Sequence, residues 1–327
     1  MAHAHARDDY ELLSRLNLYA FLGTALTEDE LLRTHPADAS PTGRLCQLAR
    51  QACLVPALHR SVETSHASDH KEVITLTGGA LAGANATAAV LRCEHLHDDG
   101  HPHVRLQAEK FGPSHGITSD LPIYQQPRAA LATGVLVAPQ IVATAAHVIT
   151  GCDSSRLRLV FGYRMAADGS PPSFLLKSDI YSVEQVVGVQ YDPAMGVDWA
   201  LLKVDRKVAR HEPVRVRRSR WPARGTPLHL VGHPWGVPGK YTAGGEILMD
   251  DALAYFHAEL DVFDHDSGSP AFSDADGALE GIYDGGAVRS ARVWIEHRAR
   301  AVVFRLHDSP RPRFTRTAMF EHLIDPG

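Results

Sequence analysis

The chain has 327 residues, of which 44% are hydrophobic and 22% are charged, as expected of a globular protein that can bury a core. Its formal net charge of -5 provides no basic field for nucleic acid. No apolar run is long enough to span a bilayer, so we expect no membrane-spanning segment. Residues 1–11 lack the basic start of a secretory signal, which leaves the localisation open between the cytoplasm and a non-classical export route.

The first 69 residues differ in pattern from the rest of the chain. Within residues 8–66, apolar side chains such as Leu12, Leu16 and Tyr19 recur at helical spacing. Nothing in this segment carries catalytic chemistry. We therefore expect residues 1–69 to form a helical N-terminal extension, which is a prodomain, a packing extension or a module that binds a protein partner through residues 8–66.

From about residue 70, short runs rich in Val, Ile, Leu and Tyr alternate with Gly, Pro and Asp. No helical pattern alternates with these runs, which argues against a parallel doubly wound sheet and favours antiparallel barrels or a sandwich. The small-residue tract 78–89 is typical of a flexible loop, and residues 315–324 are typical of a closing helix. Examples of the predicted strands are 73–76, 134–137, 141–144, 157–161, 201–204, 228–231 and 279–283.

Three short motifs carry candidate chemistry. The first is TAAHV, which contains His147 and directly follows a predicted strand. The second is DWALL, in which Asp198 opens a strongly apolar strand, and the third is DSGSP, a small-residue turn that contains Ser267. Each motif alone is common, but the three together in this order predict one catalytic set.

The residue types fit nucleophilic catalysis. A serine hydroxyl is a poor nucleophile until a neighbouring base takes its proton, and histidine suits that task because its pKa lies near neutrality. A buried carboxylate then orients the imidazole and stabilises its charged form. We therefore expect Ser267 to be the nucleophile, His147 the general base and Asp198 the orienting acid.

At these motifs the chain resembles trypsin-like serine peptidases, and it is most similar to the bacterial branch that includes the glutamyl endopeptidases. The segment VGHPWGVP at 231–238 resembles a turn of that branch, TGVLVAP at 133–139 resembles the strand before the catalytic histidine, and GIYDGG at 281–286 resembles the wall of the specificity pocket. The resemblance covers roughly residues 110–327. It implies an all-β peptidase domain over 70–327 with two antiparallel six-stranded barrels, and peptide-bond hydrolysis through an acyl-enzyme. It requires no cofactor and no metal.

The resemblance also implies further site residues. The backbone amides of His265 and Ser267 would form the oxyanion hole, although the family has glycine at the position of His265. Tyr283 stands where glutamyl-specific members carry a pocket histidine, which removes the reason to expect cleavage after Glu, and Asp284 adds a carboxylate near the triad.

Asp261 lies six residues before Ser267, an offset that in trypsin-like enzymes places an acid at the floor of the substrate pocket. Gly285 and Gly286 would leave the mouth of that pocket open. This arrangement predicts cleavage after Arg or Lys; the alternative is that Asp261 only serves its own loop. Asp266 has no evident partner in the sequence, because no start of the kind that pairs with this acid in trypsin is readable.

Five potential metal ligands crowd one short stretch: Cys93, His95, His97, His101 and His103. The Asp98-Asp99-Gly100 segment between them predicts a hairpin turn that would bring some of these side chains together. A histidine-rich, solvated turn is the interpretation we favour, and we predict no metal site.

The sequence thus predicts a serine endopeptidase that acts on a protein or peptide substrate, with no role for nucleic acid or membrane. The competing hypothesis is a pseudoprotease that keeps the fold as a protein-binding module, with His265 and Asp284 disabling turnover.

Overall fold

The computed structural model describes residues 70–115, 123–150, 152–218, 222–249, 252–285, 289–295, 298–304 and 311–324. The helical extension predicted for residues 1–69 lies outside the described residues, and the boundary at residue 70 stays a prediction. No helix among the residues described is both long and apolar enough to cross a membrane.

The chain divides into two compact units. One contains residues 70–111, 125–286 and 311–327, and it holds both barrels described below. The other combines residues 1–69 with two insertions, 112–124 and 287–310. Its described elements are most of helix α6 (Phe111–His115) and the antiparallel hairpin of β18 (Arg289–Ile295) and β19 (Arg298–Phe304).

The first barrel closes through six antiparallel strands in the order β11-β12-β8-β7-β2-β9. Its interior is filled by aliphatic side chains with no solvent exposure, among them Val90, Leu136, Val142, Leu159 and Leu202. The strands are β2 (Thr87–Arg92), β7 (Ala130–Ala138), β8 (Ile141–Thr144), β9 (Leu157–Phe161), β11 (Ile180–Asp192) and β12 (Val197–Val204).

The second barrel has the order β14-β13-β16-β17-β20-β15 and closes because β15 also pairs with β14. The short strand β1 (His70–Glu72) pairs with residues 240–242 at the start of β14. A shared apolar cluster that includes Val135, Leu201, Val231 and Ile282 packs the two barrels together. The strands are β13 (Pro227–Gly232), β14 (Lys240–Met249), β15 (Tyr255–Glu259), β16 (Pro270–Ser273), β17 (Leu279–Gly285) and β20 (Arg313–Arg316).

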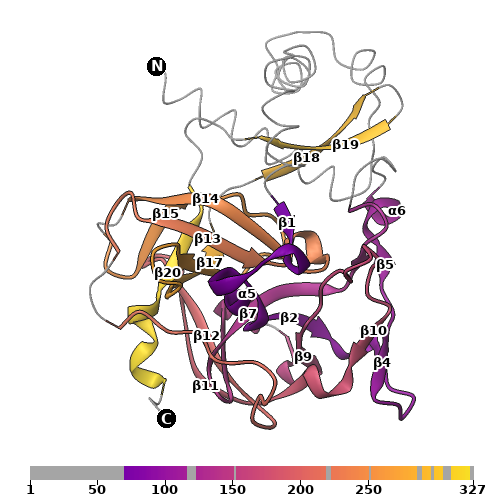
Figure 1. Ribbon diagram of the computed structural model, residues 1–327. Coiled ribbons are helices and arrows are strands. Elements are labelled where there is room, and N and C mark those ends of the chain that lie inside the picture. Colours follow the sequence, from indigo (N-terminus) through magenta and orange to yellow (C-terminus); the bar gives the residue numbers. More distant parts are fainter. Residues whose placement is uncertain are drawn as a thin grey trace. The chain divides into compact units, whose positions relative to one another are not determined.

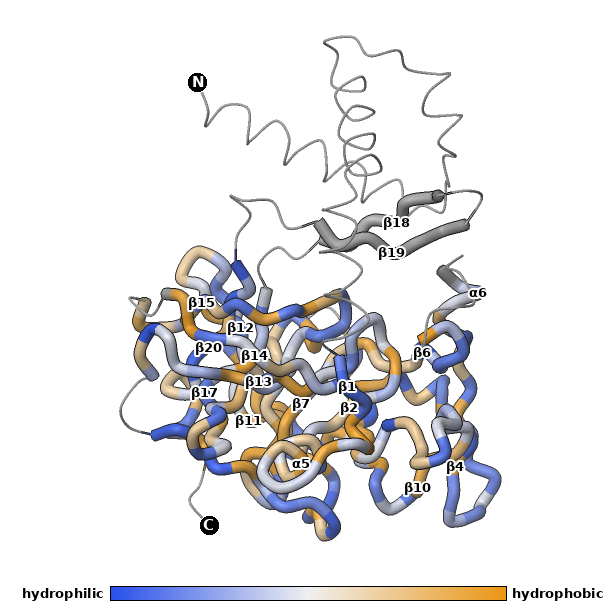
Figure 2. Tube along the Cα trace, turned by 45° about the horizontal axis from the view of Figure 1, so that its top comes forward, coloured by the Kyte–Doolittle hydropathy of each residue, from blue (hydrophilic) through white to orange (hydrophobic). Residues whose placement is uncertain are grey.

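The predicted fold class is therefore confirmed: the structure contains two closed, antiparallel six-stranded barrels of the trypsin-like kind (Figure 1). Apolar residues lie along the strands of both barrels, whereas the connecting turns are mostly hydrophilic (Figure 2). The remaining elements are short: β3 (Leu96–His97), β4 (His103–Leu106), β5 (Glu109–Lys110), β6 (Pro127–Arg128), β10 (Phe174–Leu176), helix α5 (Gly78–Asn85) and several 3-10 turns.

Three local predictions were wrong. Residues 73–75 form a 3-10 turn instead of a strand, and the tract read as a flexible loop holds helix α5 followed by strand β2. The predicted closing helix begins instead as strand β20, because Phe314 and Thr315 pair with β17, and it continues as two 3-10 turns at 317–319 and 321–323. In the last case, pairing with a distant strand overrides the helical spacing.

Candidate active site

The three residues of the predicted catalytic set come from both barrels. His147 lies in a 3-10 turn (Ala146–Val148) that directly follows β8, and Asp198 is the second residue of β12. These two strands are paired, with Ala200 opposite Thr144, so both side chains lie at the same end of the first barrel. Ser267 lies in the turn before β16 of the second barrel.

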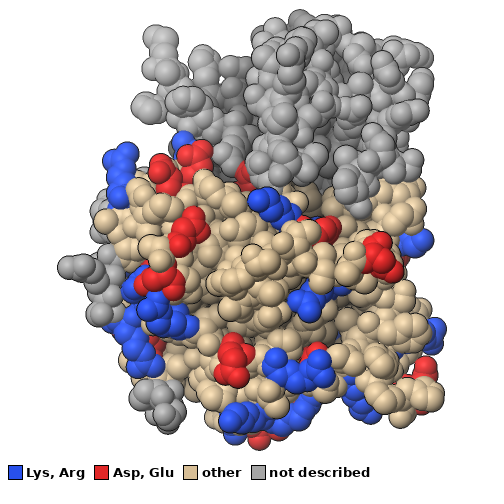
Figure 3. Space-filling view, viewed as in Figure 1, with Lys and Arg blue, Asp and Glu red and all other residues tan. Residues whose placement is uncertain are grey.

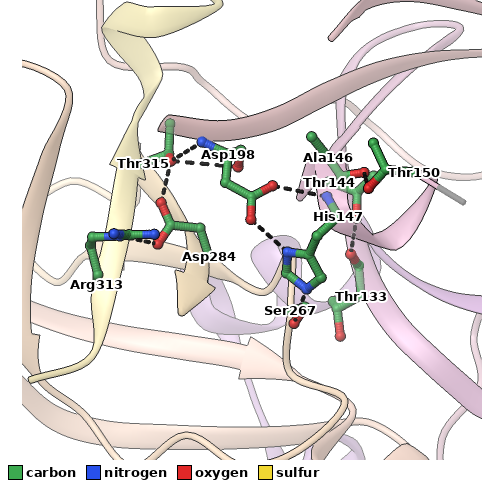
Figure 4. Close-up of polar contacts among 10 residues, drawn as sticks. All are labelled: Thr133, Thr144, Ala146, His147, Thr150, Asp198, Ser267, Asp284, Arg313 and Thr315. Carbon is green, nitrogen blue, oxygen red and sulfur yellow. Dashed lines mark hydrogen bonds and ion pairs between the residues drawn. The ribbon is translucent and has the colours of Figure 1, made fainter. Parts of the chain in front are cut away.

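The side chains of these three residues form one hydrogen-bonded chain (Figure 4). His147 Nε2 lies 2.8 Å from Ser267 Oγ, and His147 Nδ1 lies 2.5 Å from Asp198 Oδ2. The backbone N–H of His147 also donates to Asp198 Oδ1, at 3.0 Å. Both carboxylate oxygens of Asp198 therefore hold His147, which fixes the orientation of the ring and the proton on Nδ1.

Solvent exposure differs sharply between the side chains of this hydrogen-bonded set. The Asp198 side chain is 4% exposed, whereas the His147 side chain is 36% exposed. A buried carboxylate loses hydration and interacts strongly with the ionisable ring that it contacts. The imidazole, in contrast, is open to a reactant that reaches Ser267.

A second polar group supports Asp198 from strand β20. The backbone N–H of Asp198 donates to Thr315 Oγ1 at 3.2 Å, and the Thr315 hydroxyl donates to Asp284 (Figure 4). The other oxygen of Asp284 accepts a hydrogen bond of 2.8 Å from Arg313 Nε. Burial raises the pKa of Asp284 to about 7, and the charge of Arg313 opposes that rise.

The backbone around Ser267 is held by glycine geometry and by two hydrogen bonds. Gly268 has a φ of 84°, and a Cβ there would lie 2.1 Å from the carbonyl oxygen of Thr133. The Gly268 N–H donates to Tyr283 O at 2.7 Å, and the Thr133 N–H donates to Ser267 O at 2.8 Å. The position after Ser267 therefore accepts only glycine.

His265 adopts the left-handed conformation, with a φ of 74°, that glycine adopts without strain. Its imidazole is held by Leu131 O, at 3.0 Å from Nδ1, and by Arg128 Nη2, at 2.7 Å from Nε2. In the described part of the chain, no hydrogen bond uses the backbone N–H of His265 or of Ser267. These two amides, two positions apart, thus have no acceptor among the described residues, as an oxyanion hole requires.

Asp266, between these two amides, is a buried acid with neutral partners. It is 1% exposed, accepts from the Phe263 N–H at 2.8 Å, and lies 3.4 Å from the Ser269 hydroxyl. Burial raises its pKa to about 8.

The residues predicted to contact substrate fall into two groups. Tyr283 is 7% exposed and the Asp284 side chain is fully buried. Asp261 and Gly285 are partly exposed, and Gly285 ends strand β17. Gly286 lies outside the described residues.

The cysteine–histidine stretch forms the predicted hairpin, with Leu96 of β3 opposite Leu106 of β4. His95 Nδ1 lies 2.9 Å from Gln107 O. Among the described residues, no group of three or more His, Cys, Asp or Glu side chains could hold a metal ion. Cys93 and Cys152 are free thiols.

Sequence reasoning missed three polar residues of the site. Thr315 lies in the segment predicted to be helical and Arg313 lies just before it, whereas Arg128 belongs to no recognisable motif. Their roles depend on side chains brought in from other strands, and no local pattern reports such contacts.

The comparison with protein families agrees with the fold. Residues 132–282 match the family model described as a trypsin-like peptidase domain. Among solved structures, the inactive form of an Rv3671c serine-to-alanine mutant from M. tuberculosis is 14% identical, with a TM-score of 0.43, over 78% of this chain and 93% of that chain. The VesB protease of Vibrio cholerae is 12% identical, with a TM-score of 0.49, over 78% of this chain and 65% of that chain. No curated protein sequence matches. Residues 132–282 are therefore similar to a trypsin-like peptidase domain.

Proposed function

We propose that the protein is a serine endopeptidase with Ser267 as nucleophile, His147 as general base and Asp198 as orienting acid. The observation that supports it best is the continuous hydrogen-bonded chain from Ser267 Oγ through His147 to Asp198 Oδ2, at 2.8 Å and 2.5 Å. A peptidase domain implies a protein or peptide substrate.

In the first half-reaction, Ser267 Oγ attacks the scissile carbonyl carbon while His147 Nε2 takes the hydroxyl proton. Asp198 stabilises the imidazolium that forms, and the amides of His265 and Ser267 stabilise the oxyanion. The tetrahedral intermediate collapses, His147 gives its proton to the leaving amine, and the acyl group stays on Ser267. In the second half-reaction, His147 takes a proton from water, which attacks the ester; collapse releases the carboxylic acid and returns the proton to Ser267.

A fluorophosphonate probe tests this mechanism without knowledge of the substrate. The native protein should be labelled, and mass spectrometry should find the adduct on Ser267. The variants Ser267→Ala and His147→Ala should remain unlabelled. His229→Gln is the matched control, because His229 also pairs with an aspartate, Asp274, at 2.6 Å, and it should keep labelling. A native protein that is folded but unlabelled would favour the pseudoprotease instead.

Cleavage after Arg or Lys is the specificity that we propose, with Asp261 as the residue that pairs with the substrate cation. A half-buried carboxylate can form such a pair. A peptide-library digest should show Arg and Lys enriched before the cut, and Asp261→Asn should remove the enrichment. Equal cleavage patterns for the two proteins would leave Asp261 as a residue of its own loop.

Two finer assignments belong to the same proposal. The first is membership of the bacterial branch that includes the glutamyl endopeptidases. It rests on the turn at 231–238, where His233 is buried and its Nδ1 lies 3.2 Å from Thr133 Oγ1. The second is the division into residues 1–69 and a peptidase domain from residue 70. Deletion of residues 1–69 should change activity if they form a prodomain, and should change only binding if they recognise a partner.

A further inference from the structure

Two bulky residues carry unusual backbone conformations. Within the described ranges, Trp235, with a φ of 54°, and His265, with a φ of 74°, are the only non-glycine residues in the left-handed region. Side chains disfavour this region because Cβ approaches the backbone, so such residues persist only where their surroundings hold them. The two lie 30 positions apart in the sequence, yet the same side chain holds both.

That side chain is Arg128, the last residue of β6 and two positions before the start of β7. Arg128 Nε donates to Trp235 O at 3.0 Å, and Arg128 Nη2 lies 2.7 Å from His265 Nε2. Because Leu131 O can only accept, His265 Nδ1 carries the ring proton and Nε2 accepts from Arg128. Burial, and then the charge of Arg128, lower the pKa of His265, which keeps the acceptor nitrogen free of a proton. The exposed carboxylate of Asp264 is the other charge that acts on this ring.

Trp235 and His265 are also joined directly through the backbone. The Trp235 N–H donates to Asp264 O at 2.6 Å, which fixes the peptide plane between Asp264 and His265. In a trans peptide the C=O and the N–H point in opposite directions, so the His265 N–H faces away from Trp235. The Trp235 indole packs on Phe263, with ring centroids 4.1 Å apart, and on Phe111, at 5.5 Å. These contacts hold Trp235 itself in place.

We propose that Arg128 is a positioning residue that holds the oxyanion hole in its donating conformation by clamping His265 and Trp235. The inference rests on the proposed function. A clamp of this kind would let a side chain occupy a position that otherwise requires glycine, since the backbone conformation is imposed from outside. Among the described residues, no hydrogen bond or ion pair joins Arg128 to Ser267 or to His147.

Kinetics of three variants test the clamp. Arg128→Met keeps the apolar stem and removes the donors; it should lower kcat by about 10- to 100-fold and change KM little, because oxyanion donors act on the transition state. His265→Gly provides the second background for Arg128→Met, because it keeps the backbone amide and glycine adopts the required φ by itself. In the Arg128→Met/His265→Gly double variant, kcat should recover most of the loss. An unchanged kcat in Arg128→Met, or the same loss in both backgrounds, would overturn the proposal.

Arg206→Met is the control for a general loss of stability. Arg206 also braces the backbone, with Nη2 donating to Ile180 O at 2.8 Å, and it stacks on Tyr181 at 4.1 Å from the ring centroid. This variant should lower the melting temperature without changing kcat.

A crystal structure of the Arg128→Met variant tests the clamp independently of turnover. In that variant, the φ of His265 should leave the left-handed region or the Trp235 N–H···Asp264 O bond should break. An unchanged loop would refute the clamp. If the native protein neither labels with fluorophosphonate nor cleaves peptides, the proposed function fails, and this structure still decides whether Arg128 holds the loop.

Discussion

Asp284 accepts a 2.8 Å hydrogen bond from Arg313, and this ion pair lies beside the carboxylate that we assign to catalysis. Thr315 connects the two acids: its hydroxyl donates to Asp284, and its oxygen accepts from the backbone N–H of Asp198. Arg313 thus balances the charge of Asp284 on the side of Asp284 that is remote from His147. Without Arg313, a negative charge on Asp284 would stand uncompensated near Asp198.

Removal of Arg313 alone should be strongly destabilising. In Arg313→Met the buried carboxyl of Asp284 loses its cation, and we expect the free energy of unfolding to fall by about 3 kcal/mol. The double variant Arg313→Met/Asp284→Asn should recover much of that loss. Urea unfolding of the native protein, of the single variants Arg313→Met and Asp284→Asn, and of the double variant gives the coupling energy. Equal losses in the single and double variants would rule out the charge explanation.

Arg215→Met provides an exposed comparison for the same measurement. Arg215 pairs with Asp276, but its side chain is 60% exposed. Ion pairs on the surface contribute little, so the loss should stay below about 1 kcal/mol.

Thr315 should affect turnover more than stability. Thr315→Val keeps the shape but removes the acceptor for the Asp198 N–H and the donor to Asp284, so we expect kcat to fall by about tenfold through misplacement of Asp198. Thr315→Ser restores both hydrogen bonds and should restore kcat. Equal kcat values for the valine and serine variants would show that the hydroxyl has no positioning role.

The burial of Asp266 predicts a pH dependence of stability. The pKa of Asp266 in the folded protein is about 8, whereas the usual value in an unfolded chain is near 3.9. Between these two pH values, Asp266 is protonated in the folded state and ionised in the unfolded state. Its contribution to stability is full below about pH 4 and is lost as the pH rises through about 8. Between pH 5 and pH 7, the free energy of unfolding of Asp266→Asn, relative to that of the native protein, should rise by about 1 kcal/mol per pH unit.

Urea unfolding across this pH range measures the difference between the two proteins. Asp168→Asn is the control, because Asp168 is exposed and hydrogen bonds from Ser170 lower its pKa. The difference in free energy of unfolding between Asp168→Asn and the native protein should therefore not change over the same pH range. Parallel curves for Asp266→Asn and the native protein would contradict a raised pKa at Asp266.

Gly268 and Gly277 share a positive φ but differ in surroundings. Gly268→Ala should lower the free energy of unfolding by more than about 3 kcal/mol and abolish activity, because the new Cβ would overlap Thr133 O in addition to the conformational strain. Gly277 has a φ of 68° and no atom within 4 Å of an added Cβ, so Gly277→Ala should cost only about 1 kcal/mol. Thermal unfolding of both variants makes the comparison, and similar melting temperatures would contradict it.

The sequence predicted the barrels because their strands are short, rich in branched residues and bounded by turns. Residues 141–144 and 157–161, for example, are strands with the predicted limits. Helix α5 was missed because it begins with two glycines, which are typical of loops, although the segment is also rich in alanine. Strand β20 was missed because its pairing partner, β17, is separated from it by a long insertion.

The same distinction applies to the site. Short motifs identified His147, Asp198 and Ser267, which the structure brings together. The supporting contacts of Arg313, Thr315 and Arg128 could not be predicted, because each depends on the register or packing of strands that are distant in sequence. In particular, the pairing of Ile282 with Thr315 brings Asp284 within reach of that hydroxyl.

Strands β17 and β20 are neighbours in the second barrel although residues 286–312 separate them. Since loop-closure entropy grows only with the logarithm of loop length, replacing this excursion by a turn of a few residues would change the free energy of folding by only about 2 kcal/mol. Evolution can therefore lengthen, shorten or exchange the segment that contains the β18–β19 hairpin while the alignment of the two barrel strands stays intact. The connection is a natural place for graft and deletion engineering.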